Sequence, residues 1–227
     1  MNLEKKLQLY ILIADRRDLP EEISPERAFS EHASSEVAVS SVRPESALAR
    51  KLVARALHAF LGRNPSPEEL AGETRAEGGK PYFPAFPDFH YNISHSGSYV
   101  VCGYGAQPIG IDIEKIPDKA ERASAIAGHF YSEQEKNALN GLTDLPMRRL
   151  YTRFWTSRES YIKLTGRGLS EPFKSFYPDL TAGRIYSKNE RGREIFITEC
   201  EAPEGYCMSI CTYMPVEHVV RHCFPDR

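Results

Sequence analysis

The sequence predicts an α+β fold with two lobes. Helical periodicity occurs in a few long segments, whereas most other apolar residues stand in short or alternating runs bounded by Gly and Pro. Both kinds of segment occur in each half of the 227-residue chain, which favours one lobe over residues 1–115 and another over residues 116–227. The seam near Glu114–Asp118 is then the default place for a ligand site.

The first half is expected to contain a strand, a helix and three further strands. The apolar run at residues 7–14 predicts an opening strand rather than a signal peptide, because charged residues follow it directly and no small-residue cleavage site does. Between Pro44 and Leu61 apolar residues recur every four positions, with Pro at the entry and Gly62 at the exit, which is typical of a helix. Residues 64–88 are polar and Pro-rich, so we expect loop with at most one short strand. The strands that follow are expected around His90–Ile93, Ser98–Tyr104 and Gln107–Ile113.

The second half is expected to be helical first and then to form strands. The helices are expected at Glu121–His129, Ser132–Asn140 and Pro146–Thr165. The strands are expected at Gly183–Ser187, Glu194–Glu201, Tyr206–Tyr213 and Val216–Cys223.

Composition excludes several classes of protein. Hydrophobic residues make up 41% and charged residues 26%, which is ordinary globular composition and excludes disorder, collagen and coiled coil. With 29 Lys and Arg against 31 Asp and Glu, the net charge of -2 provides no overall attraction to nucleic acid or an anionic membrane, so neither is an expected partner. The odd number of cysteines, five, without a Cys-x-x-Cys motif favours a reducing compartment. We therefore expect a cytoplasmic protein.

Two carboxylates share one face of a predicted strand. In the run Ile109–Glu114 the isoleucines alternate with Gly, Asp and Glu, so Asp112 and Glu114 point the same way. Their repulsion costs free energy unless a cation lies between them, and hard oxygen ligands of this kind suit Mg²⁺. An edge strand with two solvated acids explains the same string, and taken alone it is the simpler interpretation.

A second candidate group lies in the last predicted helix. Glu159 and Lys163 are four residues apart and share a helix face, which also fits a surface ion pair. The surroundings favour a polyphosphate ligand or an acidic partner, because basic residues outnumber acidic ones from position 148 to position 174. The seven basic residues are Arg148, Arg149, Arg153, Arg158, Lys163, Arg167 and Lys174.

A third candidate group is the polar turn after the strand at His90. Ser94, His95 and Ser96 supply hydroxyls and an imidazole that could hold a phosphate. A hydroxyl-capped turn with a structural histidine explains the turn equally well.

These motifs together resemble a known family. The runs GGKPYF (Gly78–Phe83), FHYNISHSG (Phe89–Gly97), GIDIEKI (Gly110–Ile116) and FWTSRESYIKLTGRGL (Phe154–Leu169) stand in the order and spacing of the surfactin-synthetase-type 4′-phosphopantetheinyl transferases. The resemblance covers the chain from about Pro44 onward.

The resemblance implies an activity, a fold and partners. Members of the family transfer the 4′-phosphopantetheine group of coenzyme A to a serine of an apo acyl, peptidyl or aryl carrier protein and release adenosine 3′,5′-bisphosphate. Their two similar α+β lobes are related by a pseudo-two-fold axis, and coenzyme A binds at the lobe interface. Mg²⁺ is the implied cofactor and a monomer the default state. Carriers of nonribosomal peptide, polyketide and fatty acid biosynthesis present the same serine chemistry, so the natural carrier stays open.

The resemblance also implies roles for individual residues. Asp112, Glu114 and Glu159 correspond to the Mg²⁺ ligands, and Lys163 to the lysine that contacts the phosphates and assists the leaving group. Glu159 or Glu135 is the candidate general base for the carrier serine, and both alternatives stay open.

Coenzyme A contacts follow in the same way. Lys80 and Pro81 match the residues that flank adenine, and Ser94 and His95 those that hold the 3′-phosphate. A further basic contact of the family falls on Ser46 here, and we expect Arg43 and Arg50 as substitutes.

The implied docking surface for the carrier spans the helices after Pro117 and the segment from Gly166 to about Ile197. Its apolar contacts are expected from Gly168-Leu169 and Pro172-Phe173.

Two rival functions fit the residues. One is a catalytically idle carrier-binding module, and the other is a Mg²⁺-dependent phosphodiesterase that transfers a nucleotide phosphate to water. All three acids and Lys163 are present, which argues against the idle module.

Overall fold

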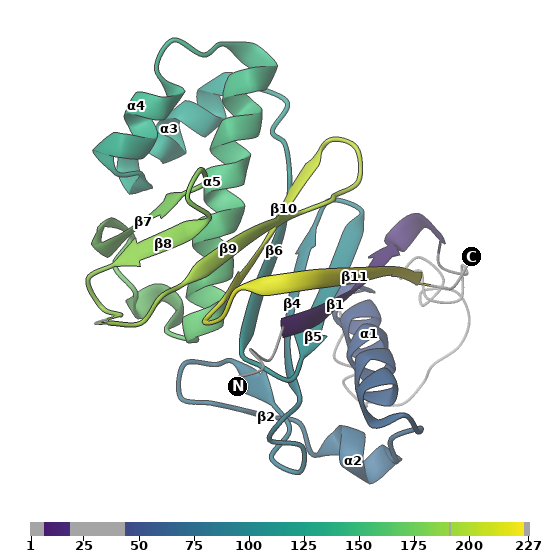
Figure 1. Cartoon of the computed structure of the whole chain (residues 1–227). Coiled ribbons are helices and arrows are strands. Elements are labelled where there is room, and N and C mark those ends of the chain that lie inside the picture. The colour runs from purple at the N-terminus through teal and green to yellow at the C-terminus, as the bar shows by residue number, and fades with distance from the viewer. Residues whose placement is uncertain (1–6, 19–43, 191, 225–227) are drawn as a thin grey trace, which may run out of the picture.

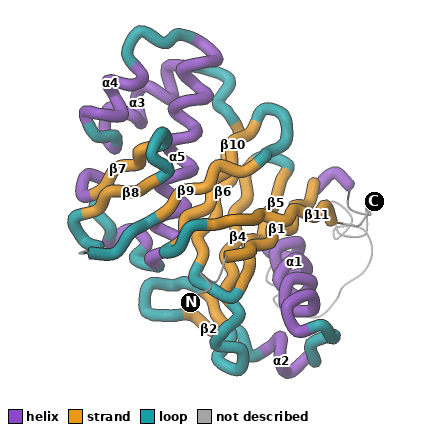
Figure 2. The backbone as a smooth tube through the Cα atoms, viewed as in Figure 1, coloured by secondary structure: helices purple, strands orange, loops and turns teal. Residues whose placement is uncertain are grey.

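The computed structural model describes residues 7–18, 44–190 and 192–224, and Arg43 lies outside this part of the chain. Two β-sheets lie side by side at the centre, and helices cover their outer faces (Figure 1). Figure 2 shows the same path as a tube, with the strands gathered in the middle and the helices in two separate groups.

The first sheet has the strand order β11-β1-β5-β4. Strand β1 (Leu7–Asp15) pairs in parallel with β11 (Val216–Phe224) and antiparallel with β5 (Tyr99–Gly105), which in turn pairs antiparallel with β4 (His90–Ser96). Helix α1 (Pro44–Leu61) packs its apolar stripe onto this sheet. The shared core includes the helix residues Leu48, Leu52, Val53, Ala56 and Leu57 and the aromatic residues Phe83, Phe89, Tyr91 and Tyr104.

The second sheet has the strand order β6-β10-β9-β8-β7 and is antiparallel along its length. Its strands are β6 (Ile109–Lys115), β10 (Tyr206–Thr212), β9 (Phe196–Cys200), β8 (Arg184–Ser187) and β7 (Phe176–Asp179). The long helix α5 (Asp144–Thr165) crosses β6 and β10, while α3 (Ala120–Phe130) and α4 (Glu133–Leu139) pack against it (Figure 1).

One apolar core joins the two sheets. It contains alternate residues of β1 and of β6, with contributions from β5 and β10. The buried residues are Leu9, Ile11, Ile13, Val101, Ile109, Ile111, Ile113, Met208 and Ile210. Each such side chain contributes about 1.5–3 kcal/mol when fully buried, so this core opposes separation of the sheets strongly.

The sheets exchange strands across the predicted lobe boundary at 115/116. Strand β6 precedes that boundary but pairs with β10 in the second sheet, whereas β11 follows it but completes the first sheet beside β1.

The helices and strands that the sequence predicts are present within a few residues of their expected bounds. Residues 64–88 contain more structure than expected: the short helix α2 (Pro67–Ala71) and the hairpin of β2 (Thr74–Arg75) and β3 (Pro81–Tyr82). The capping box at Ser66 and the proline after it explain the helix. Strand β7 was not expected either, because it contains Pro178, which an edge strand tolerates.

No helix among the described residues combines the length and the apolar character that crossing a membrane requires.

Candidate active site

A row of side chains fastens β4 to β6 where the two sheets meet. Asn92, Ser94 and Ser96 alternate along β4 and point toward β6, because side chains two residues apart lie on one face of a strand. Their oxygens accept hydrogen bonds of 3.3, 3.3 and 3.0 Å from the backbone amides of Ile111, Ile113 and Lys115, respectively. Strand β6 is at the edge of its sheet, so these side chains accept the backbone hydrogen bonds that a neighbouring strand would otherwise accept.

Asp112 lies at the centre of this seam and is only 2% exposed. The Ser94 hydroxyl donates to its Oδ1 at 2.7 Å, and the Lys163 ammonium donates to the same oxygen at 2.7 Å and to Ser94 Oγ at 2.8 Å. Burial raises the pKa of Asp112, and Lys163 and Ser94 oppose that rise. The other oxygen, Oδ2, is buried without a hydrogen-bond partner among the described residues.

Glu114 and Glu159 adjoin Asp112. The Ser96 hydroxyl donates to Glu114 Oε2 at 2.7 Å. Burial, with the nearby charges of Asp112 and Glu159, raises the pKa of Glu114 to about 7. Burial and the charge of Asp112 also raise the pKa of Glu159. The negative charge of Asp112 thus acts on both glutamates, and a bound cation would relieve this repulsion.

A close approach of backbones places α5 on β6. A Cβ atom at Gly110 would lie 1.9 Å from the Ser160 carbonyl oxygen and 2.4 Å from the Leu164 amide nitrogen, so only glycine fits there. This contact brings Glu159 and Lys163, which share one face of α5, against the acidic face of β6.

The donor set fits a divalent cation, although the carboxylates are not gathered around one point. Carboxylate oxygens are ligands that Mg²⁺ prefers, and the unpartnered Oδ2 of Asp112 is an available one. Among the residues described, however, no three His, Cys, Asp or Glu side chains are close enough to share an ion. Lys163 holds the position next to Asp112 instead.

Glu135 does not belong to this site, which corrects the sequence-based expectation that it is a candidate base. Its side chain is 1% exposed and forms an ion pair with Arg158, which is itself fully buried. Its Oε2 also accepts hydrogen bonds from the amide and hydroxyl of Ser132, at 2.8 and 2.7 Å, in a capping box that starts α4. Both oxygens therefore serve to hold α4 against α5, and neither is available to an incoming serine.

Lys80 and Pro81 line a separate pocket between the β2–β3 hairpin and the end of α5. Its volume is about 320 Å³, and its walls include His90, Leu164 and Tyr213. The Lys80 ammonium donates to the carbonyls of Ile109 at 2.8 Å and Leu164 at 3.0 Å, and burial lowers its pKa to about 8. Only the aliphatic stem of Lys80 is therefore free to face a ligand.

The residues expected to contact the 3′-phosphate do not lie together in the structure. Ser94 is buried and its hydroxyl is already bonded to Asp112, whereas the next residue, His95, is exposed on the other face of β4. Ser46 and Arg50, on α1, are exposed.

A larger cavity of about 710 Å³ opens beside Glu114. Ser96, Lys115 and the aromatic residues Tyr151 and Trp155 of α5 contribute to its walls. Of the three acids, Glu114 thus lies at the edge of a space that can admit a substrate.

The basic run at positions 148–174 is largely neutralised inside the protein. Five of its seven basic side chains form ion pairs with acidic residues of the same chain: Arg148 with Asp144, Arg153 with Glu199, Arg158 with Glu135, Lys163 with Asp112, and Arg167 with Glu171 and Glu190. The excess of positive charge along the sequence is therefore not an excess in space.

Sequence reasoning missed the roles of Asn92 and Ser96. The signal was present, because their spacing of two with Ser94 matches the spacing of Asp112 and Glu114. It became meaningful only once β4 and β6 were known to lie side by side.

The part of the chain that carries this site is similar to known proteins. Residues 108–211 match the 4′-phosphopantetheinyl transferase superfamily. This segment contains Asp112, Glu114, Glu159 and Lys163. A 4′-phosphopantetheinyl transferase of Bacillus subtilis is 39% identical over 142 residues, covering 61% of this chain and 62% of the relative. The 4′-phosphopantetheinyl transferase Sfp of Bacillus subtilis strain 168 is 37% identical over 147 residues, with the same coverage of 61% and 62%.

The chain thus spans less than two thirds of the length of these curated relatives. Among solved structures, a holo-(acyl-carrier-protein) synthase from Bacillus anthracis in complex with CoA (3′,5′-ADP) is similar at a TM-score of 0.40 and 16% sequence identity. That match covers 46% of this chain and 92% of the other.

Over about 61% of its length, this chain is therefore similar to the 4′-phosphopantetheinyl transferases, with 37–39% identity to two of them.

Proposed function

We propose that this protein transfers the 4′-phosphopantetheine group of coenzyme A to a serine of an apo carrier protein and releases adenosine 3′,5′-bisphosphate. The observation that carries the proposal is the contact of Lys163 with Asp112 beside Glu114 and Glu159, within the segment that matches the superfamily. The proposal includes two lobes, residues 1–115 and 116–227, related by a pseudo-two-fold axis with the site at their seam.

Asp112, Glu114 and Glu159 would hold Mg²⁺ in this reaction. The bound ion would supply positive charge to the diphosphate of coenzyme A. Asp112 would contact the ion through Oδ2, which has no hydrogen-bond partner among the described residues, while Lys163 stays on Oδ1. Of the three N–H donors of Lys163, two are used by Asp112 and Ser94, so the third can donate to the bridging oxygen that leaves with adenosine 3′,5′-bisphosphate.

Glu159 is the remaining candidate to accept the proton of the carrier serine. Burial and Asp112 raise its pKa, which brings a carboxylate closer to the basicity that proton transfer requires. The serine oxygen then attacks the β-phosphorus of coenzyme A, and the bond from phosphorus to the bridging oxygen breaks.

The nucleotide part of coenzyme A would bind in the pocket that Lys80 and Pro81 line. Pro81 and the stem of Lys80 would flank the adenine in the pocket below the β2–β3 hairpin. His95 would contact the 3′-phosphate, while Ser94 would orient Asp112 and Lys163 rather than bind phosphate.

Carrier docking would use an aromatic surface on α3 and α5. The Phe173 ring lies 4.8 Å from Phe130 and 6.0 Å from Trp155, between ring centroids, and Phe130 is 36% exposed. Leu169, also expected to contact the carrier, has a side chain that lies outside the described part of the structure.

We further propose that the protein is a monomer and acts in the cytoplasm. All five cysteines are free thiols, which agrees with a reducing compartment.

The test is to incubate the protein with coenzyme A, Mg²⁺ and apo carrier proteins of several pathways, and to weigh the carriers. A mass gain of one phosphopantetheine is expected. No gain on any carrier would refute the transferase. Hydrolysis of coenzyme A without a carrier would favour the phosphodiesterase, and binding of carrier without either reaction would favour the idle module.

A further inference from the structure

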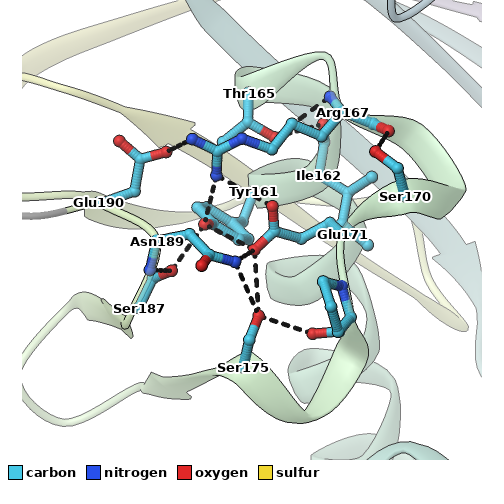
Figure 3. A network of polar contacts seen from close by, with 11 residues as sticks. Tyr161, Ile162, Thr165, Arg167, Ser170, Glu171, Ser175, Ser187, Asn189 and Glu190 are labelled. Carbon is cyan, nitrogen blue, oxygen red and sulfur yellow. Dashed lines mark hydrogen bonds and ion pairs between the residues drawn. The ribbon is translucent and has the colours of Figure 1, made fainter.

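A buried carboxylate organises the loop that follows α5 (Figure 3). Glu171 has a side chain that is 0% exposed, in the loop between α5 and β7. Four neighbouring side chains surround it and direct donors to it: Arg167 at 2.9 Å, Asn189 at 2.9 Å, Ser175 at 3.1 Å and Tyr161 at 3.3 Å. Arg167 also forms a 2.6 Å ion pair with Glu190, which lies in the turn after β8. We call these six residues the Glu171 network.

The network has the properties of a fixed support. Charge-assisted hydrogen bonds hold the pKa of Glu171 below its ordinary value in spite of its burial, so the group is ionised at neutral pH. Arg167 links two acids from different loops with its planar guanidinium, which a flexible ammonium does not do as well. Because Arg167 follows Gly166, the residue that ends α5, the network fixes the point where the chain leaves the helix.

That exit point touches the β2–β3 hairpin. A Cβ at Gly78 would lie 1.6 Å from the Gly166 carbonyl oxygen, so the two backbones meet with no room for a side chain. A Cβ at Gly166 would be 3.4 Å from the Cβ of Lys80, whose ammonium bonds the Leu164 carbonyl. The hairpin therefore rests on the segment that the network holds in place.

The same two elements form opposite walls of the pocket of about 320 Å³. Pro81 and Lys80 come from the hairpin, and Leu164 and Thr165 come from the end of α5. A shift of Gly166 moves the hairpin against α5 and changes the width of the pocket. Neither Arg167 nor Glu171 lines the pocket itself.

We propose that the Glu171 network positions the pocket that receives the adenine of coenzyme A, so that Arg167 and Glu171 set nucleotide affinity without touching the nucleotide. The proposal rests on the proposed function for the identity of the ligand. A displacement of about 1 Å in a positioning element is enough to weaken binding or reaction strongly. A loop support that merely stabilises the fold would change the amount of folded protein and leave the affinity of each folded molecule unaltered.

The experiment measures binding of adenosine 3′,5′-bisphosphate by titration calorimetry for the wild type and for Glu171→Gln. We expect the Kd to rise about tenfold. In transfer assays we expect the KM for coenzyme A to rise by a similar factor, with kcat and the KM for the carrier unchanged. We also test a truncated donor, in which a methyl group replaces the adenosine portion. Because that donor does not use the pocket, we expect the wild type and Glu171→Gln to transfer from it with equal kcat.

Two further variants and a control complete the design. Arg167→Lys reaches only one of the two acids and should give a smaller rise in Kd, and Asn189→Ala removes one donor from an exposed residue and tests the network if Glu171→Gln fails to fold. Arg153→Met breaks the 2.6 Å ion pair with Glu199 elsewhere on α5 and should leave the Kd unchanged. An unchanged Kd in both Glu171→Gln and Asn189→Ala would overturn the proposal, as would an equal loss of kcat with both donors. If the wild type binds the nucleotide but modifies no carrier, the transferase function is refuted. The comparison of Kd values between the wild type and the variants still tests the role of the Glu171 network in that case.

Discussion

The surroundings of Asp112 have opposing effects on the ionisation of its carboxyl group. Burial disfavours the ionised form, whereas Lys163 and Ser94 favour it, and one of its two oxygens stays without a hydrogen-bond partner among the described residues. An arrangement of this kind is expensive as a structural device, because a buried charge with an unsatisfied oxygen costs free energy. It is reasonable for a group whose free oxygen would contact a bound cation.

Replacement of Asp112 separates these two roles. Asp112→Ala is expected to lower transfer by at least about a hundredfold, since the deletion removes a buried ligand for the cation that would balance the diphosphate. The fold should survive, because the change removes a buried charge and Lys163, at 25% side-chain exposure, can turn to water. Carrier mass spectrometry and thermal unfolding measure the two effects. Glu201→Ala, which breaks a surface pair with Arg221, is the control; wild-type activity in Asp112→Ala would refute the metal assignment.

Glu135 gives the opposite prediction. Glu135→Gln leaves the fully buried guanidinium of Arg158 without a charged partner, so we expect a loss of about 3 kcal/mol in the free energy of unfolding. The kcat of the folded fraction should stay at the wild-type value. Denaturant unfolding and active-fraction-corrected kinetics test this pair of statements. A stable variant with a hundredfold lower kcat would return Glu135 to the list of candidate bases.

At the scale of residues, the strand and helix periods were sufficient to form two pairs of side chains but not to bring the pairs together. Alternation placed Asp112 and Glu114 on one face, and a spacing of four placed Glu159 with Lys163. Glu135 could not be judged in the same way, because its partner Arg158 lies on another helix and only packing brings them together. Ser94 was assigned to the 3′-phosphate through the family resemblance, and the structure shows its hydroxyl bonded to Asp112.

Among the elements, α5 is the one on which the site depends most. It carries Glu159 and Lys163, and its position on β6 is set by the absence of a side chain at Gly110. Gly110→Ala is expected to force the two backbones apart, since the new methyl group would lie within 2.4 Å of backbone atoms of Ser160 and Leu164. We expect lower thermal stability together with loss of transfer. Gly128→Ala, where a Cβ meets open space on α3, is the matched control and should retain both.

The β2–β3 hairpin supplies a pH-dependent contact through Lys80. Its pKa falls from 10.5 to about 8 on burial, so between these pH values the folded chain has released a proton that the unfolded chain still binds. Unfolding then takes up a proton, and the free energy of unfolding must rise with pH over this range. Denaturant unfolding at pH 7.5, 9 and 10 should show wild type gaining stability relative to Lys80→Met. A constant difference between the two proteins across this range would contradict the shift.

The basic run shows where element-scale prediction fails. Seven basic residues within one helix and the following loop suggested a positive surface, yet five of them face acids that are distant in sequence or on neighbouring turns. Sequence-local charge is a poor guide to surface potential when a helix packs against several other elements. Arg149 and Lys174 are the members of the run without an ion pair among the described residues, and they are the better candidates for contact with an acidic carrier.

At the scale of the whole molecule, the two predicted lobes share one core and exchange strands. Because Leu9 and Ile11 of the first sheet pack against Ile111 and Ile113 of the second, neither sheet can be exposed without opening the other. We therefore expect one cooperative unfolding transition, in which the fluorescence of Trp155, the single tryptophan, coincides with far-UV circular dichroism. Two separated transitions would show instead that residues 1–115 and 116–227 unfold independently.

The parallel pairing of β1 with β11 has a consequence for how the chain reaches this state. The two strands lie far apart in the sequence, so the edge of β1 that β11 covers stays open in a nascent chain until the segment between them and β11 itself have been synthesised. Pairings between such distant segments carry the highest loop-closure cost and slow folding. During that interval an apolar strand with unpaired amides and carbonyls is a template for association with other chains. Molecular chaperones that shield open strand edges would therefore matter more for the yield of folded protein than for its stability once it is folded.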